Sequence, residues 1–394
     1  GINPYVDHRF SENSEIYFRG IFNRFSDQEY RRRVTYAVSD GEIARELKDR
    51  LETQTIAQAA FGGRHLLPGF FQVDYRVSYG YADEDEPNAV YSTFLQEDVL
   101  FNPNVDPNSI DPNNIQANPL NEDFNLYEFD GLENETNFTS ERNFNAHFNG
   151  ALPLPTRDGF AGLLKFGFKN RFSKKQRNNE VFENGLPDEA IPVFTQILDP
   201  DYTKASYRDG LYNIGTAFQA PGVIRGLFNT PGIETEKDFE EDSADYRARE
   251  NIFAVYAMGQ LSIGDKFQLV PGIRYEQTDV RYTGYEVQFD DEGDLASIVP
   301  VDGRNSFKNF FPSIHANYRI NDRTAIRAAY TRSLARPNFV DLVPYRLILD
   351  EDRELLRGNP FLEPTTSDNF DLMAEHYFDS VGIVSGGIFY KRLN

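Results

Sequence analysis

Apolar and polar side chains alternate through many separate stretches of the chain, and this alternation restricts the fold more than any other feature. Between Gly69 and Ala82, odd-numbered aromatic and aliphatic residues alternate with even-numbered polar residues, and similar alternation recurs around 143–154, 160–172 and 266–276. A period of two is typical of β-strands that have one apolar and one polar face. Helical periodicity is weak, except that Glu42–Leu51 is expected to form one short loop helix. The sequence therefore predicts an all-β fold.

The spacing of the expected strands indicates the kind of β protein. Twelve strands are predicted, at about 3–10, 15–25, 52–61, 69–82, 143–154, 159–171, 250–262, 266–285, 308–319, 324–332, 366–377 and 381–391. Their connections alternate between short turns and long segments, and the long ones cover about 26–51, 83–142, 172–249, 286–307 and 333–365. Short turns on one rim and long loops on the other are typical of outer-membrane barrels. We therefore predict a large antiparallel transmembrane β-barrel.

This pattern also predicts a topology. The segments 83–142 and 172–249 are expected outside the cell, and the turns at Gly264-Asp265 and Asn321-Asp322 in the periplasm. Residues 83–141 contain many Asp and Glu but no Lys or Arg, so they are expected to be a solvated loop without a core. On the strands, aromatic and aliphatic side chains such as Phe71, Tyr75, Phe166, Phe168, Leu269 and Ile273 are expected to face lipid. The lumen side is expected to hold Gln72, Arg76, Lys165, Lys169, Arg171, Arg274 and Arg327 beside Asp74, Glu276, Asp371 and Glu375.

Composition excludes several classes of protein. The chain of 394 residues has no Cys and a formal charge of −22, which removes thiolate chemistry and makes nucleic-acid binding unfavourable. The five His (His8, His65, His147, His315 and His376) form no spaced metal-binding pair, and no nucleophile or phosphate-loop motif occurs. We therefore expect no enzyme activity, no cofactor, and no catalytic, cofactor-binding or metal-ligating residues.

Two motifs late in the chain go beyond general barrel features. One is Thr331-Arg332-Ser333-Leu334-Ala335-Arg336-Pro337-Asn338-Phe339. The other is Gly358-Asn359-Pro360-Phe361-Leu362-Glu363-Pro364. Together they resemble the late-barrel signature of TonB-dependent outer-membrane receptors, and 382–391 is similar to the strand that follows it in that family.

The resemblance implies a 22-stranded barrel with an N-terminal plug that contacts TonB. Residues 1–394 would then be part of the barrel domain, with the plug and terminal strands outside this sequence. The first and last expected strands, 3–10 and 381–391, should then not pair to close a small barrel. The implied function is energised uptake of a scarce nutrient, of the ferric siderophore or oligosaccharide class, across a bacterial outer membrane. The alternatives are a passive pore or surface adhesin, and a soluble carbohydrate-binding protein.

The implied partners are the TonB-ExbB-ExbD complex, outer-membrane lipids and lipopolysaccharide, the substrate, and a surface lipoprotein. Substrate-binding residues are not identified, but three sets are candidates. Arg24 and Arg31-Arg32-Arg33 could neutralise lipid phosphates or simply be solvated. Loop aromatics could stack on a substrate or pack on each other (Tyr91, Phe94, Phe101, Phe124 and Tyr127). The run Asp83-Glu84-Asp85-Glu86 could hold a divalent cation, although a solvated acidic loop is the simpler interpretation.

Overall fold

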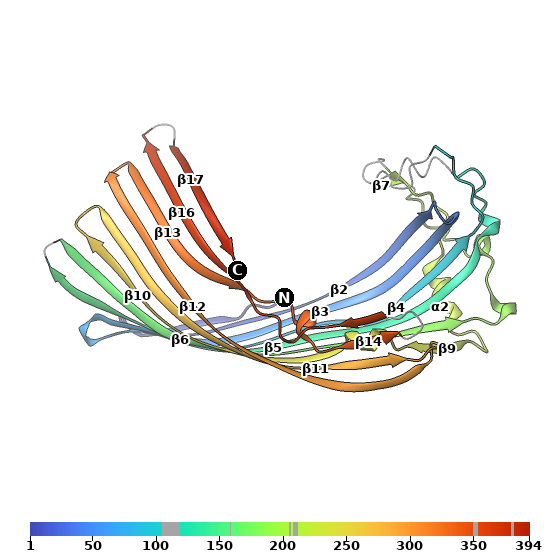
Figure 1. The fold of residues 1–394 in the computed structure, drawn as a ribbon, viewed down its shortest axis with the longest axis horizontal. Helices are drawn as coiled ribbons and strands as arrows, with labels where there is room; N and C mark the ends of the chain where they lie inside the picture. The colour runs from blue at the N-terminus through green and yellow to red at the C-terminus, as the bar shows by residue number, and fades with distance from the viewer. Residues whose placement is uncertain (105–118, 158, 205, 208–211, 350–353, 380–381) are drawn as a thin grey trace.

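One long, strongly curved antiparallel sheet makes up most of the molecule (Figure 1). The computed structural model describes residues 1–104, 119–157, 159–204, 206–207, 212–349, 354–379 and 382–394. Twelve strands follow one another across the sheet in chain order. They are β1 (Tyr5–Ser11), β2 (Ser14–Ala37), β3 (Glu42–Leu67), β4 (Phe71–Gln96), β5 (Glu128–Arg157), β6 (Phe160–Gly185), β10 (Tyr246–Ile263), β11 (Phe267–Phe289), β12 (Leu295–Asn321), β13 (Thr324–Ala335), β16 (Thr365–Phe378) and β17 (Gly382–Leu393).

All twelve predicted strands are present, but many are much longer than expected. The prediction of a helix at Glu42–Leu51 is wrong, because this segment begins β3. The long loop predicted over 26–51 is also wrong. The strands β2 and β3 pair without interruption from Ser14–His65 to Ala37–Glu42, so a short turn joins them. A transmembrane strand needs only about 9–11 residues. β2 and β3, with 24 and 26 residues, are therefore much longer than a membrane crossing requires.

The register places the apolar side chains of neighbouring strands on one face. Directly paired residues share a face, and one such series crosses six strands: Tyr75, Phe148, Phe168, Val255, Tyr275 and Phe310. Phe166 and Ile273 stand on this face too, and each exposes over a third of its surface. The prediction that this face carries the aromatic and aliphatic side chains is confirmed. The predicted lumen residues stand together on the opposite face.

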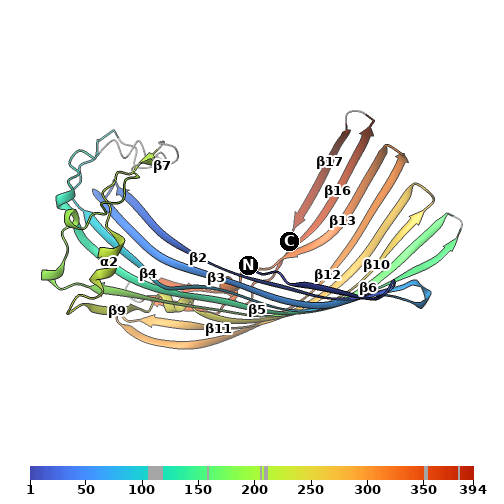
Figure 2. The same ribbon diagram turned by 180° about the vertical axis from the view of Figure 1, so that it is seen from behind.

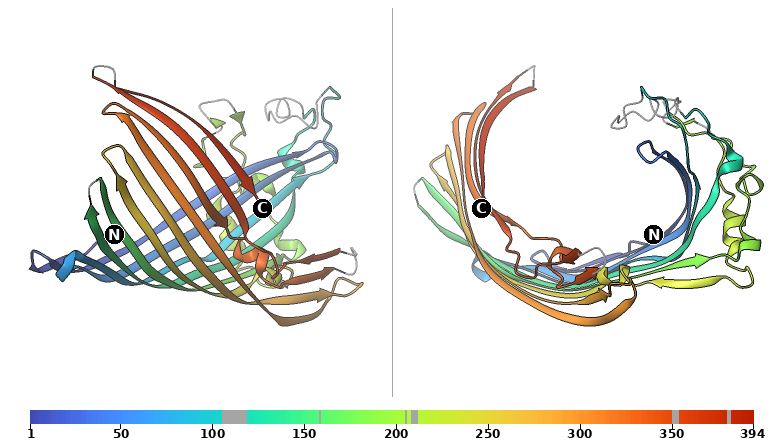
Figure 3. Two further views of the ribbon diagram at one scale, coloured as in Figure 1. Left: turned by 60° about the vertical axis from the view of Figure 1, so that its left-hand side comes forward. Right: turned by 45° about the vertical axis from the view of Figure 1, so that its right-hand side comes forward.

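The sheet is an open arc, and its two faces are covered differently at one end (Figure 3). Among the described strands, β1 and β17 form the two edges and do not pair with each other, as predicted. Residues 336–349 and 354–364 lie inside the arc, on its concave side, whereas the segment with α2 (Pro221–Leu227) lies outside it. The apolar face is therefore convex, and the charged face is concave. No helix in the described ranges is long and apolar enough to cross a membrane.

The long connections gather at one end of the strands and the short turns at the other (Figures 1 and 2). The small elements are all in the long connections: η2 (Phe124–Leu126), η3 (Asp188–Ala190), η4 (Phe194–Gln196), β7 (Ser206–Tyr207), β8 (Tyr212–Asn213), β9 (Glu234–Asp238), η5 (Glu241–Ala244), α3 (Phe339–Leu342), β14 (Arg346–Leu349) and β15 (Glu354–Arg357). The one exception is η1 (Pro68–Phe70), which forms the short turn between β3 and β4. The prediction of long connections at this end is confirmed for 83–142, 172–249 and 333–365. The long connection predicted over 286–307 is wrong, like that over 26–51, because β11 and β12 pair as far as Phe289–Leu295 and a short turn joins them at the same end.

The two faces of the sheet predict opposite responses to the same substitution. We expect Ile273→Arg, on the convex face, to destabilise the membrane-inserted protein by about 2–4 kcal/mol, because a guanidinium would then contact hydrocarbon. Val270→Arg introduces the same group on the concave face of β11 and should cost far less. Yields of folded, heat-modifiable protein in outer-membrane fractions would measure both, and equal yields would contradict the assignment of faces.

Candidate functional site

A strap of residues 336–349 and 354–364 lies against the concave face of β10 and β11. Leu342 and Val343 of the strap are buried against the strand residues Tyr246, Ala248, Val280 and Tyr282. Farther along, β14 pairs in parallel with the end of β11 and antiparallel with β15. Within the predicted loop 333–365, the described residues 336–349 and 354–364 are therefore a folded segment inside the arc.

Two buried carboxylates fix the beginning of the strap. Arg336 pairs with Glu276, and its Nε lies 3.9 Å from Glu250. Arg171 also pairs with Glu250 at 2.6 Å, and Arg274 pairs with Glu276 at 2.7 Å. Each carboxylate thus faces two guanidinium groups. Buried carboxylates need such compensation by positive charge. Because Glu250 is on β10 and Glu276 is on β11, Arg336 links the strap to both of these strands, which we call the wall.

The Gly-Asn-Pro motif closes the other end of the strap. The Gly358 amide donates to the Tyr345 carbonyl at 3.1 Å, and the Asn359 amide donates to the Asp341 carbonyl at 2.8 Å. A Cβ atom on Gly358 would lie 1.9 Å from the Val343 carbonyl oxygen, so only glycine fits there. Both motifs that carry the family resemblance therefore help to hold the strap.

A cavity of about 370 Å³ lies between the strap and the wall. Three basic side chains line it (Arg171, Lys175 and Arg336) together with Glu250 and the aromatic residues Tyr282, Phe307 and Phe339. Burial raises the pKa of Tyr282, whose hydroxyl has no hydrogen-bond partner within the described part of the chain. The cavity has more positive than negative charge, so it can accept an anionic group.

The predicted acidic run does not form one cluster. Successive strand residues face opposite sides, so Glu84 and Glu86 join Glu52 on the concave face while Asp83 and Asp85 face away. The cluster is compensated by protein groups. Arg50 pairs with Glu52 at 2.9 Å and with Glu86 at 2.6 Å, and Gln54 donates to Glu52 and Glu84.

The segment 83–142 does contain core residues, which corrects the prediction of a loop without a core. Val90, Phe94, Tyr127 and Leu132 are buried together with Ile43, Leu47 and Phe194. Ile43 and Leu47 share a face with Phe61 on the unbroken β3, so this cluster lies on the convex face. We call the cluster and the described parts of segments 97–127 and 186–245 that cover it the convex module.

Four of the five aromatic residues predicted to bind substrate belong to this module. Phe94 and Tyr127 pack on Phe194, Phe124 lies over Arg45, and Phe101 packs against Tyr36. These four aromatic residues therefore pack within the protein. Tyr91 stands on β4, and its hydroxyl donates to Glu135 at 2.5 Å.

The basic run at 31–33 is also used within the protein. Arg32 pairs with Asp199 at 2.5 Å and lies over the ring of Tyr202, whereas Arg33 pairs with Glu46. Both guanidinium groups therefore already have carboxylate partners, and their proposed role with lipid phosphates stays a prediction. Arg24 and Arg31 have no ion pair among the described residues.

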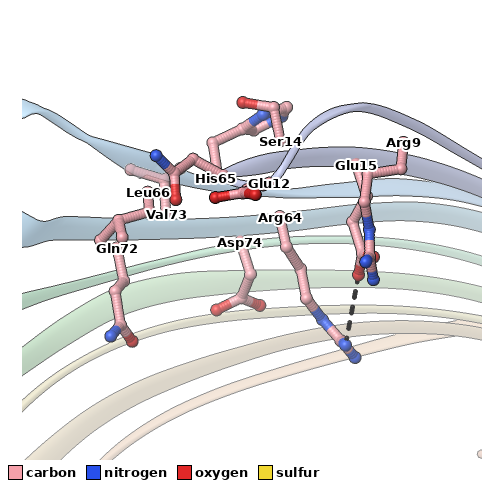
Figure 4. Close-up of a pocket in the computed structure, with 11 residues that line it drawn as sticks. Arg9, Glu12, Ser14, Glu15, Arg64, His65, Leu66, Gln72, Val73 and Asp74 are labelled. Atoms are coloured by element: carbon pink, nitrogen blue, oxygen red, sulfur yellow. Dashed lines mark hydrogen bonds and ion pairs between the residues drawn. The ribbon is translucent and has the colours of Figure 1, made fainter.

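A second hollow, of about 540 Å³, lies near the short turns of β1–β4 (Figure 4). Its ion pairs are long and exposed, with Arg64 3.5 Å from Glu15 and Arg9 3.7 Å from the same residue. Such surface pairs contribute little to stability. The hollow is open and next to the edge strand β1, so the strap cavity is the better candidate site.

Comparison with known families decides the class of this barrel. Residues 227–392 match the outer membrane protein beta-barrel family. The match includes both motifs, the strap and strands β10–β17, and the protein is located in the bacterial outer membrane. The predicted outer-membrane β-barrel fold is confirmed at this level. No curated protein matches the sequence.

Several solved structures are similar to this outer-membrane barrel chain at low sequence identity. The ferric-catecholate import receptor Fiu from E. coli K12 is 10% identical with a TM-score of 0.44, and the match covers 99% of this chain and 56% of that one. The hemophore receptor HasR of Serratia marcescens is 7% identical (TM-score 0.43; 99% and 52%). The siderophore receptor PiuA from Acinetobacter baumannii is 9% identical (TM-score 0.42; 98% and 56%). The chain thus spans about half the length of each. The expectation of a protein that is not an enzyme agrees with this class.

The ion pairs at Glu250 and Glu276 make the strap sensitive to Arg336. We expect Arg336→Gln to lower the free energy of local opening of the strap by about 3 kcal/mol, because two buried carboxylates each lose a partner. Hydrogen exchange of the Val343 and Gly358 amides would measure this. The control Arg332→Gln removes a partly exposed group 4.0 Å from Asp368 and should change exchange by less than about 1 kcal/mol. Unchanged protection in R336Q would contradict the anchoring role.

Asp245 makes the segment before β10 sensitive to pH. Burial, together with the nearby Asp242 and Glu180, raises the pKa of Asp245 to about 6, although the Asn179 amide donates to its carboxylate at 2.7 Å and lowers the pKa. A raised aspartate pKa means that stability is full below pH 4 and is lost as the pH rises through 6. We expect Asp245→Asn, which keeps the acceptor, to increase protection of the Asn179 amide at pH 7.5 and to have no effect at pH 3.5. An equal effect at both pH values would contradict this, and Asp302→Asn is an exposed control.

Proposed function

We propose that this chain is part of the barrel of an outer-membrane receptor for TonB-energised uptake of a scarce nutrient. The observation that carries the proposal is the strap, which the two late-barrel motifs hold against the charged concave wall. A passive pore has no need of a folded segment anchored by paired buried carboxylates within its lumen. The ferric siderophore and oligosaccharide classes are both retained as substrates.

The positions of the long connections and the short turns also indicate which end of the strands faces the outside of the cell. We place the strap, the convex module and the long connections outside the cell and the short turns in the periplasm, because outer-membrane barrels carry their longer loops on the extracellular side. Substrate would then meet the concave face near the strap cavity before it moves inward. The basic lining there suits the carboxylate or catecholate oxygens of a ferric siderophore.

The whole receptor would include parts that lie outside this chain. We propose that further strands continue the sheet beyond β1 and β17, because unpaired strand edges within hydrocarbon leave backbone groups without partners. A plug inside the completed barrel would connect it to the TonB-ExbB-ExbD complex. A surface lipoprotein is a further possible partner at the extracellular end.

Labelled uptake by a deletion strain tests this function. Cells without the gene, complemented with the full-length protein, should regain uptake of at least one ferric siderophore or oligosaccharide from a panel. The regained uptake should stop when TonB is absent or the proton gradient is dissipated. Uptake that persists without TonB would indicate the passive pore. Adhesion lost on deletion, without any change in uptake, would indicate the surface adhesin.

A further inference from the structure

Five basic residues from five different strands form one continuous row across the sheet. Arg142 of β5 pairs directly with Lys174 of β6, and Lys174 pairs with Arg249 of β10. Arg249 pairs in turn with Arg281 of β11, and Arg281 pairs with Arg304 of β12. We call these residues the basic row. They are far apart in the sequence, and only the register brings them together.

The basic row stands on the convex face, outside the lumen. Arg142 is two residues from Phe144 on β5, and Lys174 is two residues from Phe172 on β6, so each shares a face with that exposed aromatic side chain. Direct pairing extends this orientation to the other three strands. Four of the five side chains are exposed and Lys174 is half-buried. The row therefore faces the surroundings of the barrel.

These cations have no carboxylate partner among the described residues, in a chain whose formal charge is −22. Within the described part of the chain, Arg142 lies over the ring of Tyr81, 5.7 Å from its centroid. The acidic groups beside Arg281 and Arg304 on this face, Asp279 and Asp302, accept hydrogen bonds from Ser306 and Thr283. Asp83, which lies beside Arg142 on the same face, is hydrogen-bonded to Tyr81. On the concave face, Arg171, Arg274, Arg327 and Arg336 are paired. The concave cations Arg76, Lys165 and Lys169 have no ion pair among the described residues, but they do not stand opposite one another in a row of like charges that crosses five strands. Like charges directly opposite each other in a sheet are destabilising, so the row favours an external anion.

The position of the row suits the phosphate groups of lipids. On β5, the convex face is largely apolar from Phe144 to Leu154, which matches the 9–11 residues that cross a bilayer as a tilted strand. Arg142 and Lys174 follow at the next convex positions. On the next two strands, more residues separate the basic residue from the aromatic side chains of the apolar band. Arg249 is four residues from Phe253 on β10, and Arg281 is six residues from Tyr275 on β11. Because strands tilt in such barrels, the row rises obliquely from the membrane boundary into the headgroup layer.

We propose that the basic row binds phosphate groups of lipids in the outer leaflet. Lys and Arg form charge-assisted hydrogen bonds to phosphate oxygens, and a lipid that carries several phosphates could contact neighbouring members of the row at once. Three members, Arg249, Arg281 and Arg304, line one hollow together with Phe172. The proposal depends on the outer-membrane location and is independent of the uptake function.

Lipid binding to the full-length protein in a non-ionic detergent tests the proposal. The probes are lipid A with both phosphates, dephosphorylated lipid A and inorganic phosphate, with bound lipid counted by native mass spectrometry. We expect tight binding of the phosphorylated lipid only. Each cation near an anionic surface contributes roughly a fivefold change in affinity, so R249Q/R281Q/R304Q should raise the Kd by roughly 100-fold. The matched control R76Q/K165Q/K169Q removes three positive charges from the concave face and should leave the Kd unchanged.

Several outcomes would overturn the proposal. They are equal binding of dephosphorylated lipid A, an unchanged Kd in the convex variant, an equal loss in the concave control, and displacement by inorganic phosphate at concentrations similar to those of the lipid. If the convex variant fails to assemble, the salt dependence of the unmodified protein gives the answer. The Kd for phosphorylated lipid should rise steeply between 0.05 and 0.5 M NaCl, because salt screens exposed charges. A flat salt response would contradict a phosphate site.

Discussion

The pairing of backbone hydrogen-bonding groups is the constraint on which the rest of this structure depends. In hydrocarbon each N–H and C=O group needs a partner within the protein, so strands pair continuously through the membrane. Continuous pairing then fixes the face of every side chain, because successive residues point in opposite directions. The run of pairs from Ser14–His65 to Ala37–Glu42 shows how far this reaches, since it carries the same orientation well beyond membrane thickness. The apolar convex face and the charged concave face are two results of one register.

A register irregularity in β4, between Glu86 and Ala89, reverses which side chains of the strand face the concave side. Glu86 pairs with Asn137, whereas Val90 pairs with Asn134, so residues of the same parity face opposite sides before and after Pro87-Asn88. Glu84 and Glu86 therefore meet Arg50 on the concave face, and Val90 and Phe94 enter the convex core. Without this extra residue, the two apolar side chains would face the lumen.

The sequence predicted the twelve strands, the two faces and the end at which long connections gather, because alternation and spacing are local signals. Strand ends were underestimated, since outer segments such as 42–51 carry charges on both faces and are stabilised by cross-strand pairs like Arg33–Glu46. The link from Arg336 to Glu250 and Glu276, and the basic row, depend on register between residues distant in the chain. Part of the row could have been predicted from the sequence, because Arg142 is two residues from Phe144 and Lys174 is two residues from Phe172, at the ends of their alternating apolar stretches. The opposite faces of Asp83 and Glu84 could also have been predicted from strand alternation.

The convex module has a consequence for how such a protein can vary. Among the described residues, its long connections fold back onto the outside of the extended strands, and the strap occupies the inside. In the proposed orientation, antibodies and phages approaching the cell would meet this outer layer first, and substitutions that escape them would fall on surfaces that do not line the concave face. Variation of the outer layer would then be separated from selection on the concave face, so such a barrel could change its antigenic appearance while its inner surface stays the same.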